Sequence, residues 1–190
     1  MLYESDLSQA CSQLLETHPW LKISIETNGT IMPTYSEWQY ADSRICFVVD
    51  IKSDVCWRTN KLRQCAGIDV NTLAHYVLMS DGWNEANTKG GYTIVFKVLV
   101  NTAEELPAYV ENIVTLYNVL GANRGSMGFY SLPSLRVFFS PVMAEDGKTY
   151  NADVVKAILK LCYKNPFSGT RATHVEVGLN IQLHKLLSFR

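Results

Sequence analysis

The chain has 190 residues, of which 47 % are hydrophobic and 18 % are charged, and its formal net charge is −1. This composition excludes a disordered chain, and no apolar run approaches the roughly 20 residues that a membrane-spanning helix needs. The near-zero net charge argues against nucleic-acid binding, because binding a polyanion normally needs a basic excess or a basic stripe.

No linker rich in proline, glycine or serine divides the chain, so we expect one globular domain over residues 1–190. Residues 1–10 carry no basic region followed by an apolar core, so we expect no secretory signal. The cysteines are odd in number and have no C-x-x-C spacing: they are Cys11, Cys46, Cys56, Cys65 and Cys162. We therefore expect a cytoplasmic protein with buried structural thiols and no membrane segment.

The first half of the chain predicts three helices, with strands between the first and the second. Residues 5–17 have helical periodicity, and residues 21–27 alternate as a strand does. Asn28 and Gly29 are typical of a type I′ turn, so a hairpin with a return strand over residues 30–32 is expected. Residues 44–52 alternate again, and residues 54–66 and 69–80 predict two helices.

The middle of the chain predicts a strand over residues 92–101 and a long amphipathic helix after it. The helix begins either at a capping box of Thr102 and Glu105 or with Pro107 as its first residue, and both alternatives are open. Gly121 is expected to end it. The glycine-containing loop of residues 121–134 lies between a helix and a strand, the reverse of the dinucleotide-binding arrangement, so no phosphate site is expected.

The last part predicts a strand over residues 134–142, a helix capped by Asn151 that ends near residue 164, and a strand over residues 173–183. Most of the predicted strands have one apolar face and one mixed or polar face. That asymmetry is typical of antiparallel sheets. We therefore predict an α+β fold: a mainly antiparallel sheet of five or six strands, with helices packed on one face and the other face partly open.

The polar strand face holds the candidate catalytic residues Asp50, His174 and Glu176. His174 and Glu176 are two residues apart on one strand, roughly 6.6 Å along the same face, so both could contact one small ligand. No Walker A, G-x-S-x-G or H-E-x-x-H motif occurs, and H-x-E on a strand is frequent by chance. We therefore expect no metal and no cofactor.

The leading hypothesis is a non-enzymatic interaction or regulatory protein that binds another protein, or a second copy of itself, through the open sheet face and the loop of residues 121–134. The candidate binding residues are Lys97, Arg124, Arg136, Phe138, His174 and Glu176. Phe138 and Val48 among polar side chains favour a protein interface, since interfaces combine aromatic anchors with a polar surround.

Two other classes of function remain open. The first is a small hydrolase or nuclease whose acid/base or metal groups include the three candidate catalytic residues. The second, weaker, alternative is a nucleic-acid-binding module that uses Arg58, Lys61 and Arg63. Lys160, Lys164 and Arg171 form a similar basic group. We interpret each basic group as an ordinary solvated surface.

Overall fold

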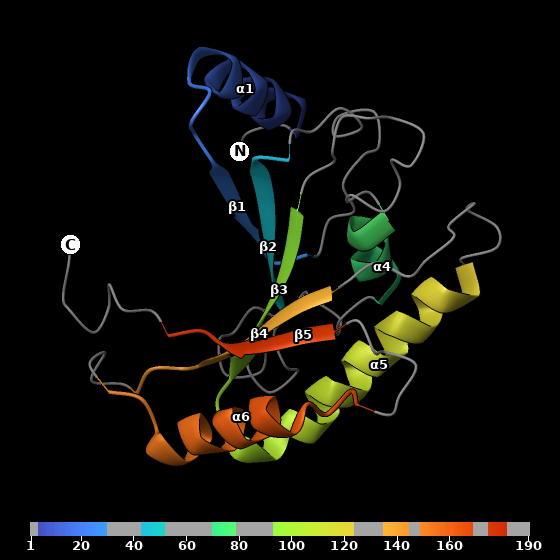
Figure 1. The fold of residues 1–190 in the computed structure, drawn as a ribbon, viewed down its shortest axis with the longest axis vertical. Coiled ribbons are helices and arrows are strands. Elements are labelled where there is room, and N and C mark those ends of the chain that lie inside the picture. The colour runs from blue at the N-terminus through green and yellow to red at the C-terminus, as the bar shows by residue number, and fades with distance from the viewer. Residues whose placement is uncertain are drawn as a thin grey trace, which may run out of the picture.

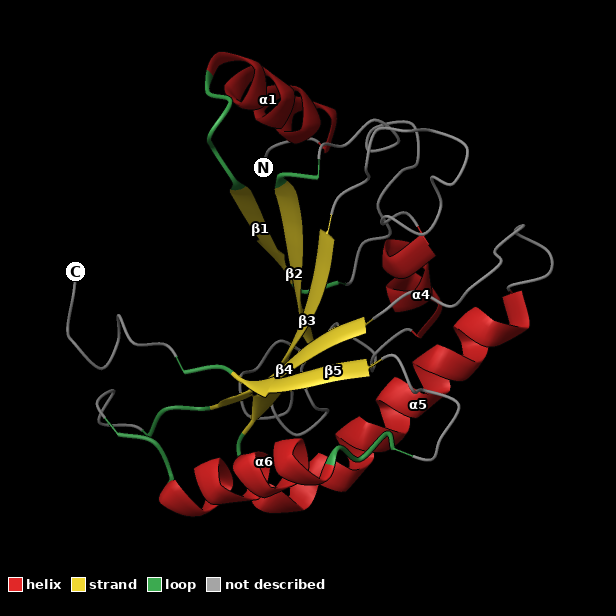
Figure 2. Cartoon of the chain, in the orientation of Figure 1, coloured by secondary structure: helices red, strands yellow, loops and turns green. Residues whose placement is uncertain are grey.

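The structure is a computed structural model that describes residues 4–29, 43–51, 70–78, 93–123, 135–144, 149–168 and 175–181. These residues form one five-stranded sheet and four α-helices, with a short 3-10 helix before the third of them. Figure 1 shows the sheet twisting strongly from β1 to β5, and Figure 2 shows the helices arranged around it.

All five strands are parallel, and their order in the sheet follows the sequence, β1-β2-β3-β4-β5. The strands are β1 (Ile23–Thr27), β2 (Ile45–Ile51), β3 (Thr93–Val100), β4 (Leu135–Pro141) and β5 (Val175–Leu179). The prediction of a mainly antiparallel α+β fold is therefore wrong, and the arrangement is α/β.

The strand direction was predicted wrongly because it was inferred from the alternation of apolar and polar residues. Alternation shows that one face of a strand is buried, and it says nothing about strand direction. The better guide is the connections: α4 (Val70–Leu78), α5 (Leu106–Asn123) and α6 (Ala152–Lys164) each lie between consecutive strands. Parallel neighbours need a crossover of a dozen or more residues, usually helical, whereas antiparallel neighbours can be joined by a tight turn.

The three crossover helices lie on the same side of the sheet (Figure 2). This follows from the strand order, because consecutive crossovers of the same right-handed sense return to the same face. The remaining helix, α1 (Glu4–Thr17), lies beyond the end of the sheet at which β1 and β2 begin (Figure 1). Arg44 joins α1 to β2 by donating hydrogen bonds to the Leu15 and Pro19 carbonyls.

The core forms between the helices and the apolar face of the sheet. The buried strand side chains on this face are Ile45, Phe47, Val49, Ile51, Ile94, Phe96, Val98, Val100, Leu135, Val137, Phe139 and Val175. Burial of a side chain of this size stabilises the fold by roughly 1.5–3 kcal/mol. Tyr109 of α5 fixes the helix to the sheet by donating a 2.7 Å hydrogen bond to the Leu99 carbonyl.

The sequence predicts that β1 pairs with the next few residues in an antiparallel hairpin. In the structure, β1 (Ile23–Thr27) pairs with β2 in parallel. The turn residue Gly29 does have the expected left-handed backbone, with φ of 65°. The predicted return strand, residues 30–32, and the predicted helix, residues 54–66, lie outside the described residues.

Of the two predicted starts of the long helix, the one at Pro107 is within one residue of the observed start at Leu106, and the capping box is not formed. A 3-10 helix, Ala103–Glu105, precedes the long helix, and the Thr102 side chain makes no capping hydrogen bond. The Glu105 carboxylate instead accepts a 2.9 Å hydrogen bond from the Asn101 backbone N–H. The helix continues through Gly121 to Asn123, so the predicted end at Gly121 is wrong.

The cap predicted for α6 is confirmed. The Asn151 side-chain oxygen accepts hydrogen bonds from the backbone N–H groups of Asp153 and Val154 at 2.9 and 3.5 Å. At the other end, Asn165 adopts a left-handed conformation with φ of 42°, which ends the helix. The helix is thus defined by local chemistry at both ends.

Candidate functional site: the second face of the sheet

The second face of the sheet points away from α4, α5 and α6, and no helix of the described residues lies on it (Figures 1 and 2). We call it the open face. Its side chains come from alternate strand positions: Ser24, Glu26, Cys46, Val48, Asp50, Thr93, Val95, Lys97, Leu99, Arg136, Phe138, Ser140 and Glu176, with Gly178 on β5. All-parallel sheets are almost always covered on both faces, so a face that the described helices leave uncovered is unusual.

The centre of the open face is apolar and partly exposed. Val48 of β2 is the direct neighbour of Val95 of β3. Lys97, the next residue of β3 on the same face, is the direct neighbour of Phe138 of β4. Leu99 follows on β3, and all four apolar side chains keep part of their surface in solvent. Glu26, Arg136 and Glu176, which surround this centre, are exposed. An apolar centre with a polar surround is the typical composition of a protein–protein interface.

Lys97 is buried on this face beside two carboxylates. Its Nζ lies 3.3 Å from Asp50 Oδ1 and 3.9 Å from Glu26 Oε2, and the side chain of Lys97 is 7 % exposed. Asp50 Oδ1 is itself buried and, despite the short distance to Nζ, accepts no hydrogen bond from any described residue because the geometry is unsuitable. The ion pair therefore neutralises the buried charges but leaves one acceptor without a well-aligned donor.

A second ion pair lies on the β4–β5 side. Arg136 Nε donates a 3.2 Å hydrogen bond to Glu176 Oε2, and both side chains are more than half exposed. A pair of this kind contributes little to stability, typically below 1 kcal/mol. Its exposed charges are better placed to contact a partner than to hold the sheet together.

The Phe138 ring lies close to Gly178 of β5, which has no side chain to displace it. A Cβ atom at Gly178 would be 2.7 Å from Phe138 Cε1 and 2.8 Å from Cδ1, closer than carbon atoms approach without a shift. The glycine thus sets the position of the one aromatic side chain on the open face of the described strands.

The candidate catalytic residues are not brought together. Asp50 is on β2 and Glu176 on β5, with β3 and β4 between them, so the two positions are separated by three strand spacings, roughly 14 Å. Within the described residues, no group of three or more His, Cys, Asp or Glu side chains could hold a metal ion. His174, Arg124 and the basic group of Arg58, Lys61 and Arg63 lie outside the described residues.

The sheet topology also lacks the usual ligand-binding position of open α/β sheets. Such sheets bind ligands where the strand order reverses, and the order β1-β2-β3-β4-β5 of the described strands has no reversal.

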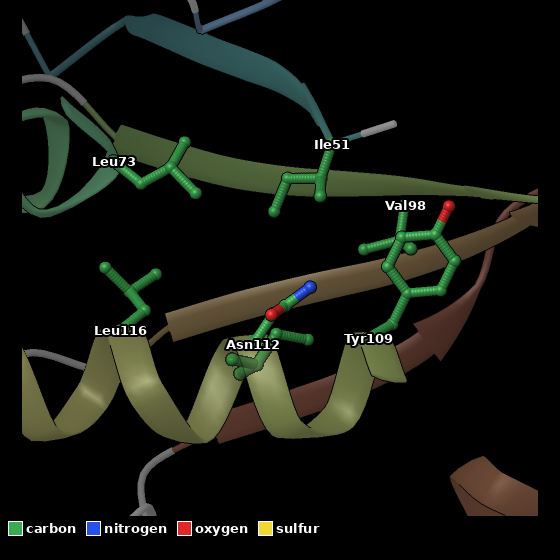
Figure 3. A pocket seen from close by; sticks show the side chains of 7 residues that line it. Ile51, Leu73, Val98, Tyr109, Asn112 and Leu116 are labelled. Atoms are coloured by element: carbon green, nitrogen blue, oxygen red, sulfur yellow. The ribbon is translucent and has the colours of Figure 1, made fainter. Parts of the chain in front are cut away.

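An apolar cavity between β2, β3, α4 and α5 measures only about 10 Å³ (Figure 3). That volume is at the lower limit for one water molecule, whereas ligand pockets measure about 300–1,000 Å³.

Two of the described thiols, Cys11 and Cys162, have surroundings that disfavour the reactive thiolate. Cys11, Cys46 and Cys162 are free cysteines. Burial raises the pKa of the Cys11 thiol, and burial also raises the pKa of Cys162, with a smaller opposing contribution from its backbone hydrogen bond. A raised pKa reduces the thiolate fraction at neutral pH, and the thiolate is the reactive form.

Sequence reasoning placed Lys97, Arg136, Phe138 and Glu176 on this surface but missed the apolar centre that Val95 and Leu99 form beside Val48. A signal was present: Val95 and Leu99 have the same strand parity as Lys97 and therefore share its face. The spacing of Asp50 and Lys97 could not be read from the sequence, because it depends on which strands are neighbours.

Comparisons of the chain with protein-family models, curated proteins and solved structures each found no match. Within the described part of the chain, no helix has the length and apolar character that crossing a bilayer requires.

Proposed function

We propose that the protein is an intracellular interaction or regulatory protein that binds a partner protein, or a second copy of itself, through the open face of its sheet. The observation that carries the proposal is the apolar centre of Val48, Val95, Leu99 and Phe138 on a parallel sheet whose crossover helices α4, α5 and α6 all lie on the opposite side. Because parallel sheets are normally covered on both faces, a face that the described helices leave uncovered is suited to intermolecular burial.

The size of the open face limits the kind of contact. Four strand spacings of about 4.8 Å give a width of roughly 19 Å, and strands of five to eight residues are about 17–26 Å long. The projected area is roughly 400 Å², whereas a standard interface buries about 800 Å² of accessible surface on each partner. This small footprint supports a reversible regulatory contact rather than a permanent one.

A charge placed at the centre of the open face tests the proposal. Val95→Lys introduces a cation into the apolar centre at a partly exposed position, so the fold tolerates it. Thr115→Lys, at an exposed position on α5, is the matched control because it adds the same charge to the helical side. We expect the wild type and Thr115→Lys to capture the same proteins from a native lysate, and Val95→Lys to lose them.

Sedimentation velocity covers the case in which the partner is a second copy. The wild type and Thr115→Lys should then sediment as a dimer at concentrations where Val95→Lys is a monomer. The proposal fails if Val95→Lys matches the wild type both in the proteins it captures and in its sedimentation coefficient.

A further inference from the structure

The outward side of α6 exposes apolar and basic side chains together. Tyr163 is 92 % exposed and Leu159 is 50 % exposed, although both lie in a helix whose opposite side is buried. Lys156, Lys160 and Lys164 are exposed beside them. We call these five side chains the outer face of α6.

The geometry of the helix explains why these side chains point outward. Val154 and Ile158 of α6 are buried in the core. Tyr163 is nine residues after Val154, and at 100° per residue it lies about 180° around the helix from it. Leu159 and Tyr163 are four residues apart, so they are neighbours on the surface.

The lysines give this surface a net positive charge. Lys160 and Lys164 form no ion pair with any described residue. Lys156 has only a 3.8 Å pair with Asp153, and both side chains are more than three-quarters exposed, so the pair is solvent-screened and weak. On a chain with net charge −1, three clustered lysines are a local excess rather than a general property.

We propose that the outer face of α6 is a second docking surface, for an acidic segment of a partner protein that places an apolar side chain against Leu159 and Tyr163. Tyrosine is enriched at the centres of protein interfaces, where its ring supplies a large contact area. Surrounding lysines accelerate and orient the approach of an acidic partner. The lysines and the apolar pair together therefore select an acidic, amphipathic partner.

A membrane surface fits this face less well. Helices that lie on membranes bury a broad apolar face in the headgroup region. The broad apolar side of α6 is already buried against the sheet, and only two apolar side chains remain outside. A pair of side chains is suited to a small protein contact.

This second surface is independent of the open face and lies on the opposite side of the molecule. Helix α6 belongs to the helical layer (Figure 2). Its buried residues Val154 and Ile158 face the core, so its exposed outer face points away from the sheet. Two partners could therefore bind at the same time. The protein would then act as a bridge between them.

The test uses the full chain and synthetic peptides of defined sequence. The probe is an amphipathic peptide with leucines on one helical face and glutamates beside them, and its binding is followed by fluorescence anisotropy at low and high salt. A lysine-for-glutamate peptide, a leucine-free glutamate peptide and vesicles of phosphatidylcholine and phosphatidylserine are the comparison probes. We expect the leucine–glutamate peptide to bind most tightly, and more weakly as salt rises.

Variants connect the binding to the outer face of α6. Tyr163→Ala should weaken binding of the leucine–glutamate peptide at least about tenfold, as loss of an interface hot spot does, while Tyr163→Phe retains it. Lys160→Glu should weaken binding most at low salt. Leu14→Ala and Lys22→Glu are the matched controls, since they change an exposed leucine of α1 and an exposed lysine before β1.

Four results would overturn the proposal. These are no binding of the leucine–glutamate peptide, equal binding of the lysine peptide, equal binding of the leucine-free peptide, or equal effects of the control variants. Vesicle binding that Tyr163→Ala abolishes, without peptide binding, would assign the surface to a membrane instead.

Discussion

Lys97 Nζ lies 3.3 Å from Asp50 Oδ1 on the open face of the sheet, and only 6 % of the surface of Lys97 is exposed. The two residues come from neighbouring strands and are direct partners in the sheet register. A buried cation is tolerated here because a carboxylate accompanies it, and Glu26 adds a second, more distant one. The ion pair thus lies next to the apolar centre of the open face.

Removing one partner of this pair should destabilise the protein more than removing both. Asp50→Ala leaves Lys97 buried with only Glu26 near it, and we expect a loss of about 3 kcal/mol, the lower end for a broken buried pair. Adding Lys97→Met removes the uncompensated charge and should restore most of that loss. Urea denaturation of both variants measures the difference. A double variant as unstable as Asp50→Ala would contradict the assigned pairing.

Gly178→Ala should destabilise the sheet through Phe138. The added methyl group would lie 2.7 Å from the ring, and displacing the ring costs about 1–3 kcal/mol. That cost exceeds the roughly 0.5–1 kcal/mol that alanine gains over glycine in a strand. In the Phe138→Ala background the strain should disappear, so a double-mutant cycle should give a coupling energy of at least about 1 kcal/mol. Additive effects would mean that the ring does not lie over Gly178.

Asn151→Ala should weaken the start of α6. The Asn151 side chain accepts hydrogen bonds from two backbone N–H groups that have no partner in the helix, and losing such a cap costs about 1 kcal/mol. Asn151→Asp keeps an acceptor at the same position and should retain the stability. The midpoint of urea unfolding tests both variants. Equal midpoints for wild type and Asn151→Ala would show that the cap is not formed in solution.

Alkylation of Cys11 and Cys162 should require a more alkaline pH than alkylation of an ordinary cysteine. Burial raises the pKa of both thiols, and only the thiolate reacts. The pKa of each thiol is higher in the folded protein than in the unfolded chain. The contribution of each thiol to the free energy of unfolding is therefore complete below its unfolded pKa and is lost as the pH rises through its folded pKa. Site-resolved mass spectrometry after iodoacetamide treatment measures the profile, with the urea-unfolded protein as control. Half-maximal reaction at the same pH in both states would refute the burial of these thiols.

The sequence was informative about which side chains face inward. The alternation of Ile45, Phe47, Val49 and Ile51 correctly predicts the buried face of β2, since burial of one face imposes a period of two. The cap at Asn151 was also predictable, because its chemistry is confined to neighbouring residues. Local physical rules were sufficient in both cases.

Strand direction and the neighbours of each strand were not predictable in the same way. Asp50 and Lys97 are 47 positions apart, and only the order of β2 and β3 in the sheet brings them within 3.3 Å. Asp50 and Glu176, grouped as catalytic candidates, are separated for the same reason, by two intervening strands. Helical stretches between strands were the signal for a parallel sheet, and the alternation was given too much weight against them.

The most direct test of the central claim uses Cys46, a native thiol on the open face, and the buried Cys11 as an internal reference. Site-resolved alkylation is compared between the isolated protein and the complex captured from a native lysate. If the open face binds the partner, Cys46 should react faster than Cys11 in the isolated protein and should be protected in the complex, while Cys11 is unchanged. Equal reaction of Cys46 in both states, or protection of Cys46 in the isolated monomer, would contradict a partner interface on this face.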